Sequence, residues 1–159
     1  MLTLEETRLL IHGTHKEFDK IMEGTGNISE HDISMLKDGD LILRNKKSFI
    51  CLFYHAGIYC GNSEEVIEFS AKLQQGWTAV ASCSSSDVDG GVTKAHVTNF
   101  IGEKPYIVLR LRYGIPKDFA QRVKVAMKSQ KKYNLLDNNC LQFALDLLGL
   151  STQSLPERQ

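Results

Sequence analysis

The stretch Tyr133-Asn-Leu-Leu-Asp-Asn-Asn-Cys-Leu-Gln-Phe-Ala-Leu-Asp-Leu-Leu-Gly149 decides the fold of this chain. Asn138 and Asn139 are favourable helix N-caps and Gly149 is a favourable residue to follow a helix, so the segment between them is predicted to be helical. Apart from one glutamine and one aspartate, this helix is apolar around its whole circumference. We therefore expect it to be buried.

The first turn of this helix carries Cys140. Unpaired backbone N–H groups and the positive end of the helix dipole favour a thiolate there and can also hold an oxyanion. A buried helix that begins with a cysteine after a polar cap is typical of thiol enzymes with a papain-like core. The alternative interpretation is a small core residue, since free cysteine is often buried.

Composition indicates a single domain. The 159 residues are 42% hydrophobic, which suits one core, and a formal net charge of zero does not favour a nucleic-acid partner. The N-terminus lacks the pattern of a signal peptide and no apolar run reaches about 18 residues, so a cytoplasmic protein is expected. The cysteines show no CxxC spacing, so we expect Cys51, Cys60, Cys83 and Cys140 to be reduced thiols. We expect the protein to have no metal site and no cofactor.

Residues 1–35 are predicted to form an N-terminal helical extension. Thr3 and Glu6 make a capping box, and apolar residues recur at helical spacing from Leu4 to Met22. Because this helix is only moderately apolar, we expect it to pack on the outside of the core. A second, short helix is predicted over residues 29–37.

The middle of the chain has the pattern of a β-sheet. The run 49–60 is almost continuously apolar, as in a strand covered on both faces, and Gly61-Asn62 closes a hairpin into the next strand. The polar segment 82–91 is predicted to be a loop, either an ordinary exposed connection or the edge of a binding cleft. The predicted strands are 41–44, 49–60, 65–69, 78–81, 91–95 and 106–113, with turns over 38–40 and 45–47.

Pro116 is placed at the first position of an amphipathic helix over residues 116–132. The region 104–132 holds nine lysines and arginines against Asp118 alone. A solvated helix face explains this charge, and contact with an anionic surface is the alternative.

His55 and Glu68 supply further groups that a thiol enzyme needs. Acyl transfer through sulfur requires a nucleophile, a base, a group that orients the base, and donors for the oxyanion. His55 lies inside the apolar run 49–60, where an imidazole is costly unless its nitrogens have partners. The candidate catalytic residues are Cys140 as nucleophile, His55 as base and Glu68 as orienting acid, and the alternative is that His55 and Cys140 are unrelated core residues.

Five short motifs occur in order along residues 36–150. They are Asp38-Gly-Asp-Leu41, Tyr54-His-Ala-Gly-Ile-Tyr59 with Gly61 after it, Gly91-Val92 leading to Asn99-Phe100, Tyr133-Asn-Leu-Leu136, and Asn139-Cys140. This order resembles the lecithin retinol acyltransferase-like (LRAT-like) family, which belongs with the NlpC-type cell-wall peptidases to the permuted papain-like group. The resemblance implies an α+β fold with an antiparallel sheet packed on the buried helix that begins at Cys140.

The resemblance also implies roles for the candidate residues. His55 matches the base of the family and Cys140 matches its nucleophile. The third polar position falls on Glu68 once a hairpin one residue longer is allowed. Glu65 is the alternative, although side-chain alternation along a strand puts it on the opposite face from Glu68.

Two departures from the lipid-acting animal members leave the substrate open. Their cysteine is commonly followed by Glu-His, whereas Leu141-Gln142 follow here, and the hydrophobic C-terminal anchor of many members does not occur in this sequence. A motif similar to residues 133–140, Tyr-x-Leu-Leu-x-x-Asn-Cys, also occurs in the PPPDE-type peptidases that remove ubiquitin-like modifiers.

The sequence therefore predicts a thiol-dependent acyltransferase or phospholipase that acts on lipid esters through a thioester on Cys140. A thiol peptidase or isopeptidase of the PPPDE or NlpC type is the alternative, and an inactive binding module is the second. The expected partners are a lipid ester or amide substrate and, through the helix at 116–132, a transient contact with an anionic membrane surface. The chain is expected to form a single domain, 1–159, with its core at 36–150 and a tail at 151–159.

Overall fold

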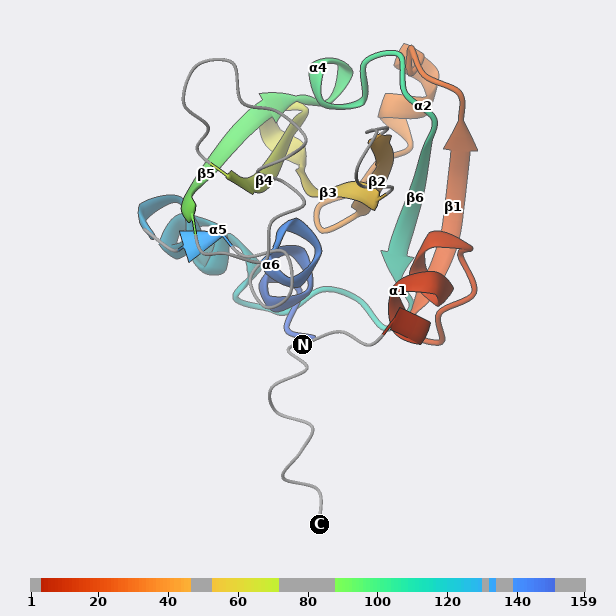
Figure 1. Ribbon diagram of the computed structural model, residues 1–159. Helices are drawn as coiled ribbons and strands as arrows, with labels where there is room; N and C mark the ends of the chain where they lie inside the picture. The colour runs from red at the N-terminus through yellow and green to blue at the C-terminus, as the bar shows by residue number, and fades with distance from the viewer. Residues whose placement is uncertain (1–3, 47–52, 72–87, 130–131, 134–138, 151–159) are drawn as a thin grey trace.

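The computed structural model describes residues 4–46, 53–71, 88–129, 132–133 and 139–150 (Figure 1). These residues form an α+β fold built on an antiparallel sheet, with helices on both sides of it. In chain order the elements are α1 (Leu4–Ile11), β1 (Phe18–Gly24), α2 (Glu30–Ser34), β2 (Leu41–Lys46), β3 (Phe53–Cys60), the 3₁₀ turn η1 (Gly61–Ser63), β4 (Glu65–Ala71), β5 (Val88–His96), α4 (Val97–Ile101), β6 (Tyr106–Leu111), α5 (Phe119–Lys128), β7 (Lys132–Tyr133) and α6 (Cys140–Leu147).

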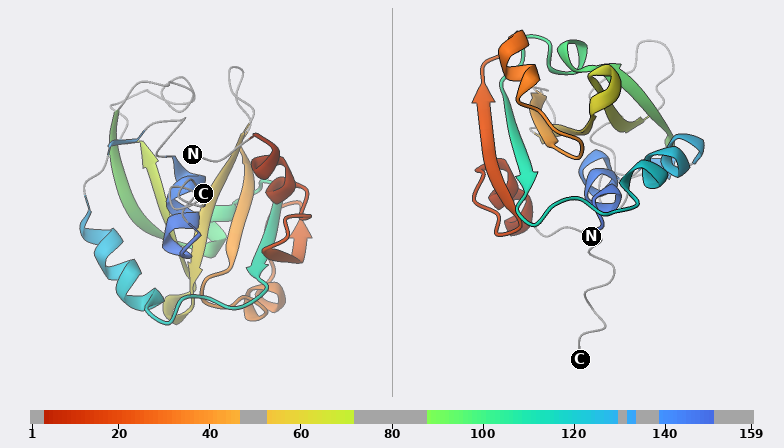
Figure 2. Two further views of the ribbon diagram at one scale, coloured as in Figure 1. Left: turned by 90° about the horizontal axis from the view of Figure 1, so that it is seen from below. Right: turned by 180° about the vertical axis from the view of Figure 1, so that it is seen from behind.

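The sheet separates two hydrophobic core clusters. The seven strands found among the described residues follow the order β1-β6-β2-β3-β4-β5-β7. One cluster joins the sheet to α1, α5 and α6, and the other joins it to α2 and α4. In Figure 1 α2 and α4 lie in the upper part of the molecule and α1, α5 and α6 in the lower part, and in the view from below in Figure 2 α6 lies between α5 and α1.

Strand β3 is buried on both faces, as its apolar sequence predicts. Ala56 and Ile58 belong to the cluster that contains α6, whereas Tyr59 belongs to the cluster under α4. Gly57 leaves the space that α4 needs, because a Cβ there would lie 2.9 Å from the Phe100 ring and 2.3 Å from a methyl of Val66. A glycine at this point allows the helix to pack directly on the strand.

Helix α6 begins and ends where the sequence predicts. The side chain of Asn139 accepts a hydrogen bond from the backbone N–H of Gln142 at 2.9 Å, and Gly149 follows the helix with a φ of +80°. The helix is buried along most of its length and packs against β3 and β4. The cap and the terminal glycine therefore fix the position of Cys140 at the first helical residue.

The prediction of one long N-terminal helix is wrong in its second half. Helix α1 ends at Ile11, Gly13 follows with a φ of +72°, and Phe18–Gly24 is strand β1. β1 pairs antiparallel with β6, Phe18 opposite Leu111 and Gly24 opposite Tyr106. The edge of β6 provides hydrogen-bond partners that the helical spacing of apolar residues does not reveal, so residues 18–24 join the sheet.

Other boundaries also differ from the predictions. Asn45 and Lys46 continue β2 through pairing with β3, and residues 88–91 belong to β5 through pairing with β4 and β7, so neither segment is the predicted turn or loop. Pro116 lies before α5, which begins at Phe119, and residues 132–133 form β7. The predicted segments 49–52 and 78–81, as well as Thr3 of the capping box, lie outside the described residues.

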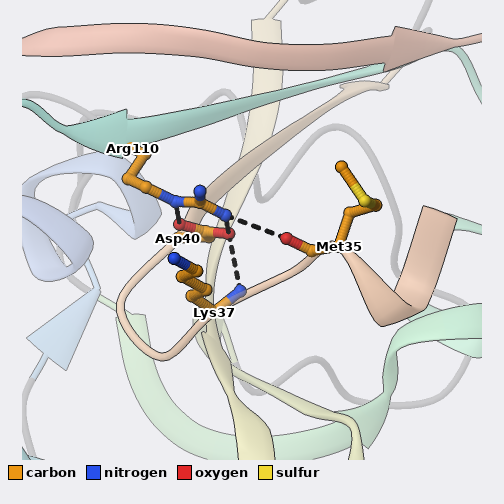
Figure 3. A network of polar contacts seen from close by, with 4 residues as sticks. All are labelled: Met35, Lys37, Asp40 and Arg110. Carbon is orange, nitrogen blue, oxygen red and sulfur yellow. Dashed lines mark hydrogen bonds and ion pairs between the residues drawn. The ribbon is translucent and has the colours of Figure 1, made fainter.

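A buried ion pair joins the start of β2 to β6 (Figure 3). The carboxylate of Asp40, which is fully buried, accepts hydrogen bonds from Nε and Nη2 of Arg110, both at 2.8 Å. It also accepts one from the backbone N–H of Lys37, and Arg110 donates to the carbonyl of Met35. This network anchors the turn after α2 to β6.

Candidate active site

The candidate site lies where β3 and β4 separate. Their pairing runs from Cys60–Glu65 to Gly57–Glu68 and ends there. Beyond that point, within the described strands, residues 53–56 pair with β2 and residues 69–71 pair with β5. Among the described residues, the edge of β3 that faces away from β2 therefore has no neighbouring strand at His55.

His55 and Glu68 are hydrogen-bonded across this opening. Nε2 of His55 lies 3.0 Å from Oε1 of Glu68, and their side chains are only 4% and 17% exposed. Register explains the contact, because Glu68 lies opposite Gly57, two residues along β3 on the same face as His55. Glu65, the alternative considered from the sequence, pairs with Cys60 at the other end of the hairpin.

Cys140 forms the second contact of His55. Burial lowers the pKa of His55, but the charge of the Cys140 thiolate and a hydrogen bond with Cys140, together with the hydrogen bond and charge of Glu68, raise it to about 9. The imidazole is therefore hydrogen-bonded to both Glu68 and Cys140. The imidazole is thus held between a carboxylate and a thiol at the first turn of α6, where a proton can pass between sulfur and the ring.

Cys60 has a different environment from Cys140. It is half-buried at the end of β3, and burial raises the pKa of its thiol to about 11. Its thiol therefore stays protonated at neutral pH and is a poor nucleophile. Cys51 and Cys83 lie outside the described residues.

Two further side chains, to which the sequence analysis assigned no role, lie beside His55. The ring of Phe100, from α4, lies 5.5 Å from the His55 imidazole and shields it. The Arg44 guanidinium lies 5.1 Å from the centre of the same ring, and its Nη1 donates to the Phe100 carbonyl at 2.6 Å. Arg44 stands directly opposite His55 in the pairing of β2 with β3, so strand register was the one signal that could have identified it.

The structure brings together the three residues chosen from the sequence. His55, Glu68 and Cys140 come from β3, β4 and α6, and contacts join the histidine to both partners. Within the described part of the chain, no group of three His, Cys, Asp or Glu side chains is arranged to hold a metal ion. No helix in that part is long and apolar enough to cross a membrane.

Comparison with known proteins assigns the family. The family model for lecithin retinol acyltransferase matches residues 34–149, which include β2 to α6 and all three candidate residues. No curated protein and no solved structure matches the chain. Because the matched segment covers well over half of the sequence, this chain belongs to the lecithin retinol acyltransferase family.

Proposed function

We propose that this protein is a thiol-dependent acyltransferase or phospholipase in which Cys140 is the nucleophile, His55 the general base and Glu68 the residue that orients the base. The observation that carries the proposal is the contact of the His55 imidazole with both Glu68 and Cys140 at the start of α6. Membership of the lecithin retinol acyltransferase family supports an acyl-transfer reaction on a lipid. In this proposal the fold is the permuted papain-like core, in which the strand that carries His55 precedes the helix that carries Cys140 along the chain.

The proposed reaction has two steps. In the first, Sγ of Cys140 attacks the carbonyl carbon of a lipid ester, the bond to the alcohol oxygen breaks, and the proton on His55 passes to that oxygen. In the second, an amine or water attacks the thioester carbonyl and gives its proton to His55, and the C–S bond breaks to restore the thiolate. The backbone N–H groups at the start of α6 stabilise the oxyanion in both steps.

The electrostatics of the pair support this chemistry. A His55 pKa of about 9 keeps the imidazole protonated at neutral pH, beside the Cys140 thiolate. The proton needed by the leaving alcohol is therefore already on the base. Glu68 supports the imidazolium and fixes the orientation of its ring.

Helix α5 is the proposed point of contact with an anionic membrane. Lys117, Lys124 and Lys128 are exposed and form no ion pair with any described residue, and Val125 and Met127 are 59% and 40% exposed beside them. Arg110, Arg112 and Arg122 instead pair with aspartates. Attraction to the surface would therefore come from the lysines, each contributing about 1 kcal/mol near anionic lipid.

The first prediction concerns the acyl intermediate. After incubation with phosphatidylcholine, intact-protein mass spectrometry should find one fatty acyl group attached to Cys140, and the Cys140→Ala variant should show none. Cys60→Ala serves as the matched control and should acylate like the wild type.

Another result would favour the alternative function, a thiol peptidase or isopeptidase. If the protein forms no adduct with phospholipids but cleaves conjugates of ubiquitin-like modifiers, with Cys140→Ala inactive, the lipid reaction is wrong. If Cys140 forms no adduct and an electrophilic thiol probe labels it no faster than Cys60, the catalytic role itself is wrong.

A further inference from the structure

Phe100 encloses the imidazole of His55 on the side of the sheet opposite Cys140. The centre of its ring lies 5.5 Å from the centre of the imidazole, and the side chain is only 1% exposed. Phe100 belongs to the hydrophobic cluster beside α4, whereas Cys140 belongs to the cluster beside α6. The imidazole is therefore held between the Phe100 ring and the thiol, and the ring limits its movement away from the sulfur.

Arg44 fixes the end of α4 that carries this ring. Its Nη1 donates to the Phe100 carbonyl at 2.6 Å, and its Cζ lies 5.1 Å from the centre of the Phe100 ring. That carbonyl belongs to the last turn of α4, where the free carbonyls and the helix dipole favour a cation. Because α4 has only five residues, few hydrogen bonds of its own hold it in place. Arg44 thus contacts both the main chain and the ring of Phe100, from the strand position directly opposite His55.

The stability of the fold does not account for an arginine at this position. Nε of Arg44 is enclosed without a hydrogen-bond acceptor among the described residues, which is unfavourable. No described carboxylate forms an ion pair with Arg44, although Arg110, Arg112 and Arg122 each have one. An apolar side chain would avoid this cost, because replacing a buried charge by an apolar group of similar volume is often neutral. Such local conflicts are expected at functional sites, and the groups that Arg44 contacts point to the support of His55.

We propose that Arg44 is a positioning residue for the reaction, which holds Phe100 against His55 and so keeps the imidazole in contact with Cys140. The inference rests on the proposed function and adds a residue that acts on the base through Phe100 and not on the substrate. Glu68 orients the imidazole from β4, and Arg44 and Phe100 support it from β2 and α4. Loss of the guanidinium should therefore slow the steps in which His55 moves a proton and leave substrate binding intact.

Steady-state kinetics on dihexanoylphosphatidylcholine, a short-chain ester that is monomeric in water, separate these two effects. Arg44→Met, which keeps the length of the side chain but has no donor, should lower kcat by about tenfold, as expected for one lost charge-assisted hydrogen bond. It should change KM by less than about twofold. Arg44→Lys, which keeps the charge and a donor for the Phe100 carbonyl, should recover most of kcat. Arg112→Gln is the control and should match the wild type, because the pair of Arg112 with Asp19 is exposed.

A double-mutant cycle shows whether Arg44 acts through the Phe100 ring. Phe100→Leu by itself should lower kcat, and the addition of Arg44→Met to it should lower kcat by no more than about a further twofold. If Arg44→Met lowers kcat equally in the wild type and in Phe100→Leu, or raises KM at an unchanged kcat, Arg44 acts on the substrate directly and the proposal is wrong.

A spectroscopic measurement that needs no turnover accompanies the kinetics. The ring current of Phe100 shifts the NMR signals of the His55 ring, and Phe100→Leu identifies the size of this shift. Arg44→Met should lose part of the shift, and Arg44→Lys should keep it. His55 signals that are the same in Arg44→Met and the wild type would show that the guanidinium does not hold the ring, and the proposal would be wrong.

Two controls separate this inference from the proposed function. Urea unfolding shows which variants are folded, and Arg44→Gln repeats each comparison if Arg44→Met is not. If the wild type does not cleave the ester, the proposed function fails, whereas the His55 signals still decide whether Arg44 holds Phe100 against the imidazole.

Discussion

At the scale of single residues, the site depends on how His55 is charged. Burial alone would lower its pKa, yet contacts with Cys140 and Glu68 raise it to about 9. Because the pKa in the folded protein exceeds the ordinary value of 6.5, the contacts stabilise the fold fully below about pH 6.5. That contribution is lost as the pH rises through about 9.

The variant Glu68→Gln tests this coupling. Loss of the carboxylate charge should lower the pKa of His55 and move the alkaline limb of kcat/KM to lower pH. The free energy of unfolding at pH 7 should fall by about 2 kcal/mol, as for a hydrogen bond to a charged group. The difference from the wild type should shrink as the pH rises above about 9, where the imidazolium is lost. Urea unfolding across this pH range and NMR titration of the His55 ring measure both effects.

Glu65→Gln is the matched control, since Glu65 lies on the same strand but pairs with Cys60. It should leave the titration of His55 unchanged. An unaltered His55 pKa in Glu68→Gln, or an equal shift in both variants, would contradict the role given to Glu68.

At the scale of elements, two helices have separate tasks. Helix α6 positions Cys140 through its Asn139 cap, and its buried surface fixes it against β3 and β4. Helix α5 buries Phe119 and Val123 and turns Lys124 and Lys128 to solvent. The first helix positions the proposed nucleophile, and the second is the proposed contact with the membrane.

The double variant Lys124→Gln/Lys128→Gln should weaken binding to vesicles that contain phosphatidylglycerol. At about 1 kcal/mol for each lysine, the loss is about 30-fold at low ionic strength. Co-sedimentation measures it, in a Cys140→Ala background so that the lipid is not consumed. The exposed pair Lys16 and Lys37 provides the control variant, Lys16→Gln/Lys37→Gln. Equal losses in both double variants, or binding that salt does not weaken, would exclude α5 as the contact.

At the scale of the whole molecule, the ion pair of Asp40 and Arg110 connects distant parts of the chain. It ties the turn before β2 to β6, beside the register that places Leu41 opposite Leu109 (Figure 3). β2 also carries Arg44, so this anchor and the candidate site share one strand. Loss of the pair should therefore affect the stability of the entire sheet.

Arg110→Gln should lower the free energy of unfolding by about 3–5 kcal/mol, because it leaves the buried carboxylate of Asp40 without its charge partner. Arg112→Gln is the control on the same side of the sheet, since its pair with Asp19 is exposed and is expected to contribute less than about 1 kcal/mol. Urea denaturation gives both values. Similar small losses in the two variants would show that the buried pair does not anchor the sheet.

The sequence by itself determined the features that depend on neighbouring residues. Asn139, Cys140 and Gly149 predicted both ends of α6, and the apolar run around His55 predicted a strand covered on both faces. Caps, glycine conformations and strand alternation act over a few residues, so they are visible in the sequence. The order of His55 and Cys140 along the chain also indicated the family.

Only the tertiary structure decided the features that depend on pairing between distant segments. Residues 18–24 became β1 because β6 offered an unpaired edge, and Asp40 met Arg110 seventy residues away. The separation of β3 from β4 placed Glu68 rather than Glu65 beside His55, and the register of β2 placed Arg44 opposite it. Register and edge pairing are set by the sheet as a whole, because shifting a strand by one residue moves every side chain to the other face.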